Sequence, residues 1–212
     1  MNLRLFGVFM MVWSFVITLP SSVLAASSIG SIKNITGTIF VQRNEEKIEL
    51  QDNADIFLHD KIIIDKEDYA ELLFADDTSI LLTGDGELTI DQYLYSPEMP
   101  ENNTAKFRIL GAAFKYIGGK ISKGHDNVGI DLDFGSVGIR GTTFYRTMHD
   151  GECWIYLEEG NILVKNNAGI ITLNPQEGTR MSNFNIAPAP PERWTSEDID
   201  FIKKKLSANY RP

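Results

Sequence analysis

The sequence predicts an all-β protein, a compact solenoid-like or sandwich-like domain that ends in one short C-terminal helix. From Ile29 to Met181, almost every segment is a short run rich in β-branched and aromatic residues, as is typical of strands. Clusters of Gly, Asn and Asp separate these runs and supply the positive φ angles that tight turns need. No helical periodicity of useful length interrupts the region.

The composition of each run places the strands in order along the chain, with turn residues between them. Strands are expected at Thr38–Arg43, Lys61–Ile64, Tyr69–Phe74, Ser79–Leu82, Leu88–Tyr93, Phe107–Ile117, Phe144–Thr147, Trp154–Leu157, Ile162–Val164 and Ile170–Leu173. Turns are expected at Asp76-Asp77, Gly84–Gly86, Gly118-Gly119, Asp150-Gly151, Glu159-Gly160 and Asn166–Gly169.

Two of these stretches resemble each other. Gly37–Asn44, followed by Ile48 and Leu50, matches Gly160–Asn167, followed by Ile171 and Leu173. The shared spacing of apolar residues predicts two similar hairpins, because alternate residues of a strand share a face. An internal duplication and a common binary pattern explain the match equally well.

The first residues have the pattern of an export signal. Arg4 precedes an apolar run, Leu5–Leu19, and small residues follow, so we expect cleavage after Ala25, with Ala26 as the next choice. An uncleaved anchor is the alternative, but the run is shorter than the roughly 20 apolar residues that span a bilayer. The pattern therefore predicts a periplasmic protein without a stable membrane anchor.

The net charge argues against nucleic acid as a partner. The chain carries −9, and loss of residues 1–25 removes the single charge of Arg4, which leaves −9 − 1 = −10. Binding to phosphate backbones requires clustered cations that release counterions. Cys153 is the single cysteine, and its apolar surroundings favour a buried thiol over intermolecular pairing.

After Ser182 the composition of the sequence changes. Ala187–Pro191 indicates an extended strap, and Thr195 with Asp198 resembles a capping box that starts a helix. Its narrow apolar stripe favours docking on the same chain, through Trp194, over binding to a partner. The expected organisation is a signal peptide at 1–25, a β domain at 26–186, and a strap with helix at 187–212.

No pattern of catalytic or metal-binding residues emerges, so we expect neither an enzyme nor a cofactor or metal site. His59, His125 and His149 stand far apart, and the sequence holds no zinc, nucleophile-elbow or phosphate-loop motif. Asp131 and Asp133 share one side of a predicted strand, but two carboxylates are too few for calcium. A solvated face explains them better.

Within residues 29–183, the string VGIRGTTF at Val137–Phe144 and the further stretches named below resemble the FecR domain family. Val137–Phe144 (VGIRGTTF) is similar to the family's hallmark "IRGT" segment, and Phe74–Thr78 resembles its "f.DGs" turn, with Asp77 where glycine is usual. Further similar stretches, in the family's order, are Gly37–Val41, Asp60–Ile62, Ala70–Phe74, Phe114–Ile121 and Tyr156–Val164.

The resemblance implies a non-catalytic periplasmic module of the bacterial envelope that binds a protein or senses a signal. The family's cytoplasmic segment, which restrains a sigma factor, is not expected, because four residues precede the apolar run. The alternative is a structural or cell-wall carbohydrate-binding protein that uses exposed aromatics such as Tyr93, Tyr95 and Trp194. An envelope protein is the favoured partner, and a cell-wall glycan is the other.

The hallmark segment supplies the candidate site, whose residues serve either structure or binding. Ile139 and Phe144 are spaced to enter the core, and Gly138 and Gly141 allow other backbone to come close. Arg140 either joins loops from within or binds an anionic ligand, and we favour the first role because guanidinium can satisfy several carbonyls. The full set is Gly138, Ile139, Arg140, Gly141, Thr142 and Phe144.

Overall fold

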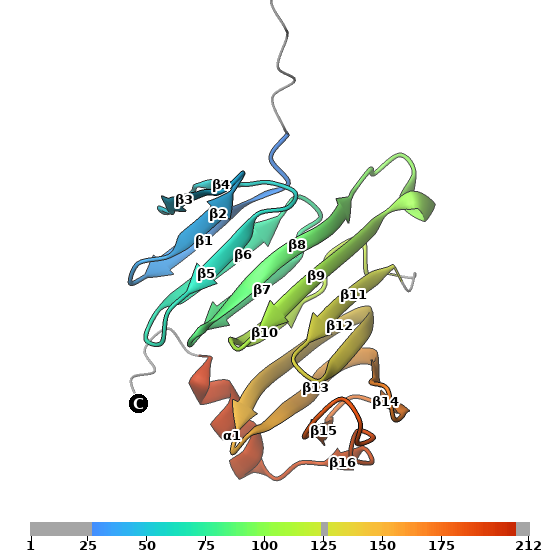
Figure 1. Ribbon diagram of the computed structural model, residues 1–212. Helices are drawn as coiled ribbons and strands as arrows, with labels where there is room; N and C mark the ends of the chain where they lie inside the picture. Colours follow the sequence, from blue (N-terminus) through green and yellow to red (C-terminus); the bar gives the residue numbers. More distant parts are fainter. Residues whose placement is uncertain (1–26, 124–126, 207–212) are drawn as a thin grey trace, which may run out of the picture.

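The computed structural model describes residues 27–123 and 127–206, and the expected signal peptide lies outside them. The described residues form sixteen strands, one α-helix and one short 3-10 helix, Pro100–Asn102, in agreement with the all-β prediction. One sheet curls over on itself, so that its two halves face each other (Figure 1). We call these halves the front layer and the back layer.

The strand pairing defines both layers. The front layer runs β3 (Glu46–Glu49), β2 (Phe40–Arg43), β5 (Lys61–Ile64), β8 (Gly86–Leu94), β9 (Thr104–Leu110), β11 (Val128–Leu132). The back layer runs β4 (Asp55–Ile56), β1 (Gly30–Thr36), β6 (Tyr69–Phe74), β7 (Ser79–Thr83), β10 (Ala113–Ile117). The long strands β12 (Gly135–His149) and β13 (Glu152–Lys165) belong to both, because β11 pairs with the first part of β12 and β10 with the last. Beside β13 lie β14 (Ile170–Leu173), in the front layer, and β15 (Glu177–Met181) with β16 (Glu192–Arg193), in the back layer.

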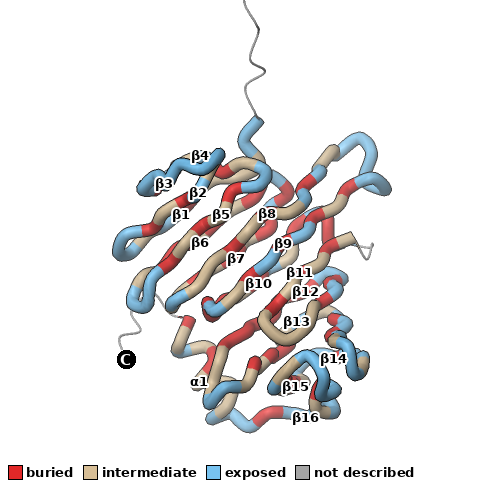
Figure 2. The backbone as a smooth tube through the Cα atoms, in the orientation of Figure 1, coloured by how far each residue is buried: buried red, intermediate tan, exposed pale blue. Residues whose placement is uncertain are grey.

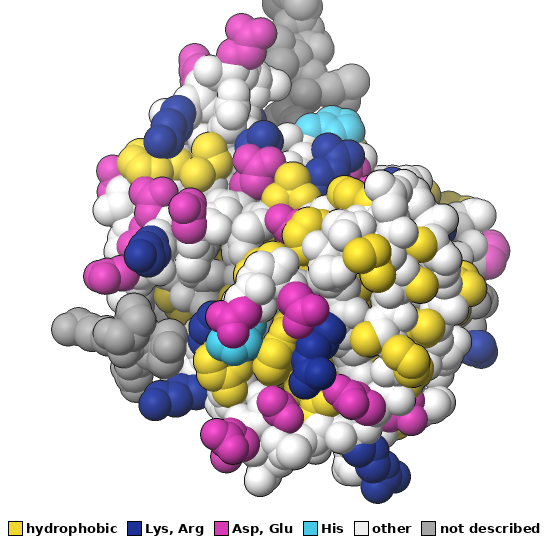
Figure 3. All heavy atoms as spheres, turned by 60° about the horizontal axis from the view of Figure 1, so that its bottom comes forward, with side chains coloured by type: hydrophobic (Ala, Val, Ile, Leu, Met, Phe, Trp, Pro, Cys, Tyr) yellow, Lys and Arg dark blue, Asp and Glu magenta, His cyan; other side chains and the backbone are white. Residues whose placement is uncertain are grey.

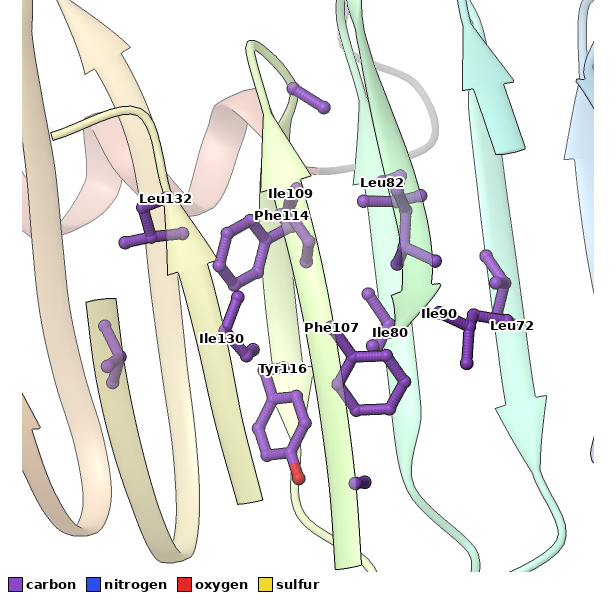
Figure 4. Close-up of a cluster of buried hydrophobic side chains, with 14 of the residues drawn as sticks. Leu72, Ile80, Leu82, Ile90, Phe107, Ile109, Phe114, Tyr116, Ile130 and Leu132 are labelled. Carbon is purple, nitrogen blue, oxygen red and sulfur yellow. The ribbon is translucent and has the colours of Figure 1, made fainter. Parts of the chain in front are cut away.

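The core lies between the layers. Ile80 and Leu82 of β7 point toward Phe107 and Ile109 of β9 (Figure 4), and all four are fully buried. Buried and more exposed residues alternate along most strands (Figure 2), as expected when one face of each strand packs inward. Each fully buried aliphatic or aromatic side chain stabilises the fold by about 1.5–3 kcal/mol.

β12 and β13 pass from one layer to the other at a pair of glycines. Gly141 and Gly160 have φ angles of +59° and +87°, which side chains rarely adopt. A Cβ on Gly160 would lie 2.1 Å from the carbonyl oxygen of Gly141. The expected turn at Glu159-Gly160 is therefore wrong: β13 continues through it as one bent strand, because the strand changes layer without ending.

A second correction concerns Phe107–Ile117, which was expected to form one strand. Gly111 takes a φ of +73° and divides the segment into β9 of the front layer and β10 of the back layer. Its apolar residues therefore enter the core from both sides.

The two matching stretches form equivalent hairpins, as predicted. Val41 pairs with Ile48 in the first, and Val164 pairs with Ile171 at the corresponding positions of the second. Both follow a glycine of positive φ, Gly37 at +91° and Gly160 at +87°. The hairpins are the opposite ends of the front layer (Figure 1).

The C-terminal helix α1 (Ser196–Lys205) packs on the outer face of the back layer, which confirms that it docks on its own chain. Thr195 and Asp198 form the expected capping box. Ile202 is buried, and the Trp194 ring stacks on Tyr156 with centroids 5.7 Å apart. Gly178 leaves room for Trp194, because a Cβ there would lie 2.2 Å from the indole ring. Within residues 27–123 and 127–206, no helix has the length and apolar character needed to cross a bilayer.

We expect the docking of α1 to weaken in acid. Burial alone would raise the pKa of Glu158, but hydrogen bonds from Lys203 on α1 and from Tyr145 outweigh it and lower this pKa. A lowered pKa in the folded state stabilises the fold above the ordinary carboxyl pKa of about 4.3, and this contribution disappears as pH falls through the lower value. Tryptophan fluorescence, which reports on Trp154 and Trp194 beneath the helix, should shift in that range. A Glu158→Gln variant should lose that pH-dependent component, and an identical acid profile in this variant would contradict the assignment.

Candidate interaction surface

The hallmark segment builds the corner of β12. Ile139 and Phe144 are buried, as expected, and Thr142 is buried beside them. Gly141 makes the bend itself. Gly138 and Arg140 instead face outward on the front layer, so the segment combines a structural corner with an exposed surface.

Arg140 does not join the loops from within, so that expectation is wrong. Its side chain is exposed, and it has no hydrogen-bonding or ionic partner among the described residues. The outward parity of position 140 explains this, because Val137 and Ile139, which alternate with it along the strand, face the core. The interior position belongs to Arg146, six residues further along the same strand.

Arg146 is fully buried and joins four segments. Its guanidinium donates to the carbonyl oxygens of Gly111 (3.0 Å) and Ala112 (2.6 Å), to the carboxylate of Asp133, and to Sγ of Cys153 (3.3 Å). Asp133 therefore binds the buried Arg146, and the expectation that this carboxylate belongs to a solvated face is wrong. Cys153 is buried as expected, and burial raises the pKa of its thiol despite the nearby cation. The signal for Arg146 in the sequence was its position two residues after Phe144. Arg140 has the same parity but lies before the irregular register between Arg140 and Phe144, which reverses the face that these positions take.

A second buried polar network surrounds Asp76 in the turn after β6. Its carboxylate accepts hydrogen bonds from Thr78, from the Tyr93 hydroxyl (3.0 Å) and from the backbone N–H of Ile121 (3.1 Å). Asp77, where the resemblance leads one to expect glycine, has a φ of +68°. The turn therefore keeps the left-handed conformation that glycine would favour.

A strip without side chains crosses the outer face of the front layer. Gly129 of β11 pairs directly with Gly138 of β12, and a Cβ on either would meet no atom closer than 3.8 Å. Lys106 of β9 lies in register with Gly129 on one side. Leu163 of β13 lies in register with Gly138 on the other. We call this shallow groove, of about 400 Å³, the glycine trough.

Two cations beside the glycine trough have no partner among the described residues. Of the cations near the trough, Lys106 and Arg108 of β9 are paired, with Asp131 (3.1 Å) and Asp91 (3.1 Å) respectively. Arg140 and Lys165 are exposed and bind no described anion. The trough is thus locally positive although the chain carries −9, which favours an acidic partner on this face.

The three aromatic residues that were expected to be exposed and to bind sugars pack against other parts of the domain. Tyr93 is 9% exposed and bonded to Asp76, and Trp194 is 7% exposed beneath α1. Tyr95 is half-buried and packs against the core. The expectation that these three rings are exposed is therefore wrong, because folding brings each against a neighbouring element.

The histidines do not form a site among the described residues. His59 lies in the turn before β5, whereas His149 packs against Trp154 and Phe201 at the end of β12. His125 lies outside the described residues. Within the described ranges, no group of three His, Cys, Asp or Glu side chains is placed to hold a metal ion.

Comparison with known proteins indicates the fold alone. The chain matches no protein-family model and no curated protein. It is similar to two crystal structures of a "putative anti-sigma factor" from Parabacteroides distasonis ATCC 8503, with TM-scores of 0.51 and 0.50 and 12% identity. The similarity covers 66% of this chain and 62% of those chains, so the chain spans less than two thirds of their length.

Proposed function

We propose that this chain is a non-catalytic FecR-like domain that, once exported to the periplasm, binds an envelope protein through the glycine trough. The FecR-like residues and the similarity in fold to the two "putative anti-sigma factor" structures support a regulatory or signal-sensing role. Export rests on the signal pattern of residues 1–25.

The observation that carries the proposal is the directly paired Gly129 and Gly138 beside two unpaired cations, Arg140 and Lys165. Glycine weakens a strand because it adds entropy to the unfolded chain and packs no side chain. Neither position needs glycine for its φ, and neither has a crowded Cβ. Close approach by a ligand or another backbone accounts for glycine here, and the cations supply charge selectivity.

A cell-wall glycan is not favoured as the partner. Tyr93 and Trp194, whose rings would stack on sugars, are packed inside the domain or beneath α1, and no aromatic side chain borders the trough among the described residues.

Filling the trough should abolish partner capture while the fold is kept. Gly138→Leu adds a side chain where the structure has space, and Arg140→Glu reverses one of the unpaired charges. With a photo-crosslinking residue at Gln92 on the trough border, each variant should reduce the captured partner at least about tenfold in intact cells.

Lys33→Glu is the matched control, because Lys33 is an exposed cation on β1 of the back layer. It should leave capture unchanged, and none of the three variants should unfold below the wild-type temperature. Equal capture by wild type and both trough variants would reject this face as the binding site.

A further inference from the structure

The front layer ends in a strand with an open edge, β14. Among the described strands, it pairs with β13 alone. The N–H of Asn166 donates to the carbonyl oxygen of Gly169 (3.0 Å), which places the bonded pairs of this hairpin at Val164/Ile171 and Ile162/Leu173. The backbone groups of Ile170 and Thr172 therefore point away from β13, and no other described segment bonds to them.

The matching hairpin at the opposite end of the layer provides an internal comparison. There the N–H of Leu50 donates to Ile39 (2.8 Å), so Lys47 and Glu49 of β3 occupy the positions of Ile170 and Thr172. Charged side chains on an edge strand prevent another strand from pairing with it. One copy of the hairpin thus carries this protection, and the other has a β-branched, uncharged edge.

The surroundings of β14 are also apolar. Ile170 is 59% exposed, and Leu163, which pairs with Thr172 on the outer face of β13, is 40% exposed. Phe184 and Ile186, in the segment that bonds to the Asn166 turn, are exposed as well. Figure 3 shows hydrophobic side chains gathered on the side where β14 and this segment lie in Figure 1.

We infer that β14 accepts an extended segment of the partner protein as an additional antiparallel or parallel strand. This inference rests on the proposed function and assigns the partner's structure at the contact: a β-branched, uncharged strand flanked by a carboxylate. Ile170 and Thr172 supply the edge hydrogen bonds, Ile170 and Leu163 contact the partner's outward side chains, and Lys165 attracts the carboxylate.

The size of this edge favours a single segment over a second copy of the chain. A stable dimer buries about 800 Å² on each partner, which a four-residue edge strand does not provide by itself. Two copies would also bring two chains of net charge −9 together and place like-charged Lys165 side chains on both sides of the interface.

The test uses short random peptides displayed on phage, selected on the mature protein and counter-selected on an Ile170→Lys/Thr172→Glu variant, which transfers the charges of β3 to β14. Selected peptides should alternate β-branched residues, carry Asp or Glu, and bind the variant at least about tenfold more weakly. Hydrogen exchange of the complex should show protection at the amides of Ile170 and Thr172. The amides of Lys47 and Glu49 should exchange as before.

A Thr172→Pro variant removes the outward donor while the bonded pairs with β13 remain, and it should also weaken binding. Glu49→Pro, its equivalent in β3, should not. If no peptide distinguishes wild type from the edge variant, or protection appears elsewhere, the inference is wrong. Concentration-dependent dimers that the charged variant abolishes would identify a second copy as the occupant and overturn it too.

The in-cell capture experiment distinguishes failure of this inference from failure of the proposed function. If in-cell capture is lost with Gly138→Leu but unaffected by Ile170→Lys/Thr172→Glu, the interaction module stands and only the edge strand is rejected.

Discussion

Replacing Arg146 with alanine should lower the free energy of unfolding by about 3–5 kcal/mol. The loss leaves the buried carbonyl oxygen of Ala112 and the part-buried carbonyl oxygen of Gly111 without this donor, and it leaves Asp133 without its cation. Because a domain has about 5–15 kcal/mol of stability, this loss is a large share of the total. Urea unfolding followed by circular dichroism measures the change.

Arg140→Ala is the control for this experiment. Arg140 lies on the same strand but is exposed and has no partner among the described residues, so the free energy of unfolding should stay within about 0.5 kcal/mol of wild type. Arg146→Lys should recover only part of the loss, since an ammonium cannot replace the planar fork that reaches four groups. Equal losses of the free energy of unfolding in Arg140→Ala and Arg146→Ala would show that burial of the arginine does not determine its contribution to stability.

Replacing Asp76 with alanine should cost about 3–4 kcal/mol, because several buried donors lose their acceptor together. The carboxylate binds Thr78, the Tyr93 hydroxyl and the N–H of Ile121, and so ties the loop after β10 to the turn after β6. Burial and then the neighbouring carboxylate raise the pKa of Tyr93, which keeps its hydroxyl protonated as a donor. The amide of Ile121 should lose protection from hydrogen exchange in the variant.

Asp77→Gly is the matched change at the adjacent residue. Asp77 is exposed and already has a positive φ, so glycine should be neutral or stabilise the turn by up to about 1 kcal/mol. A comparable loss at both positions would mean that the turn, rather than the Asp76 network, is what the substitution disrupts.

Much of the strand order was predictable because it depends on local composition. β5 (Lys61–Ile64), β6 (Tyr69–Phe74) and β14 (Ile170–Leu173) lie where their runs of β-branched residues placed them. The capping box of α1 and the equivalence of the two hairpins likewise follow from short-range spacing. Such features need only neighbouring residues to form.

The errors arose where a strand changes layer. A glycine of positive φ reads as the end of a strand, yet Gly160 bends β13 without ending it, whereas Gly111 separates two strands that read as one. The difference depends on which strands lie alongside: β12 continues to pair with β13 beyond the bend at Gly160.

The sequence by itself determined that the chain is acidic and all-β. Most of its turns, the apolar alternation of its strands and its two similar hairpins depend on residues that are close in sequence. Only the tertiary structure decided which arginine is internal. Arg140 and Arg146 are both cations in apolar strands, and the bends at Gly141 and Gly160 turn one outward and bring the other to Gly111, Ala112 and Asp133. The same closure buries Tyr93 and Trp194 and leaves β14 as an open edge. These outcomes depend on contacts between residues distant in sequence, which local patterns do not encode.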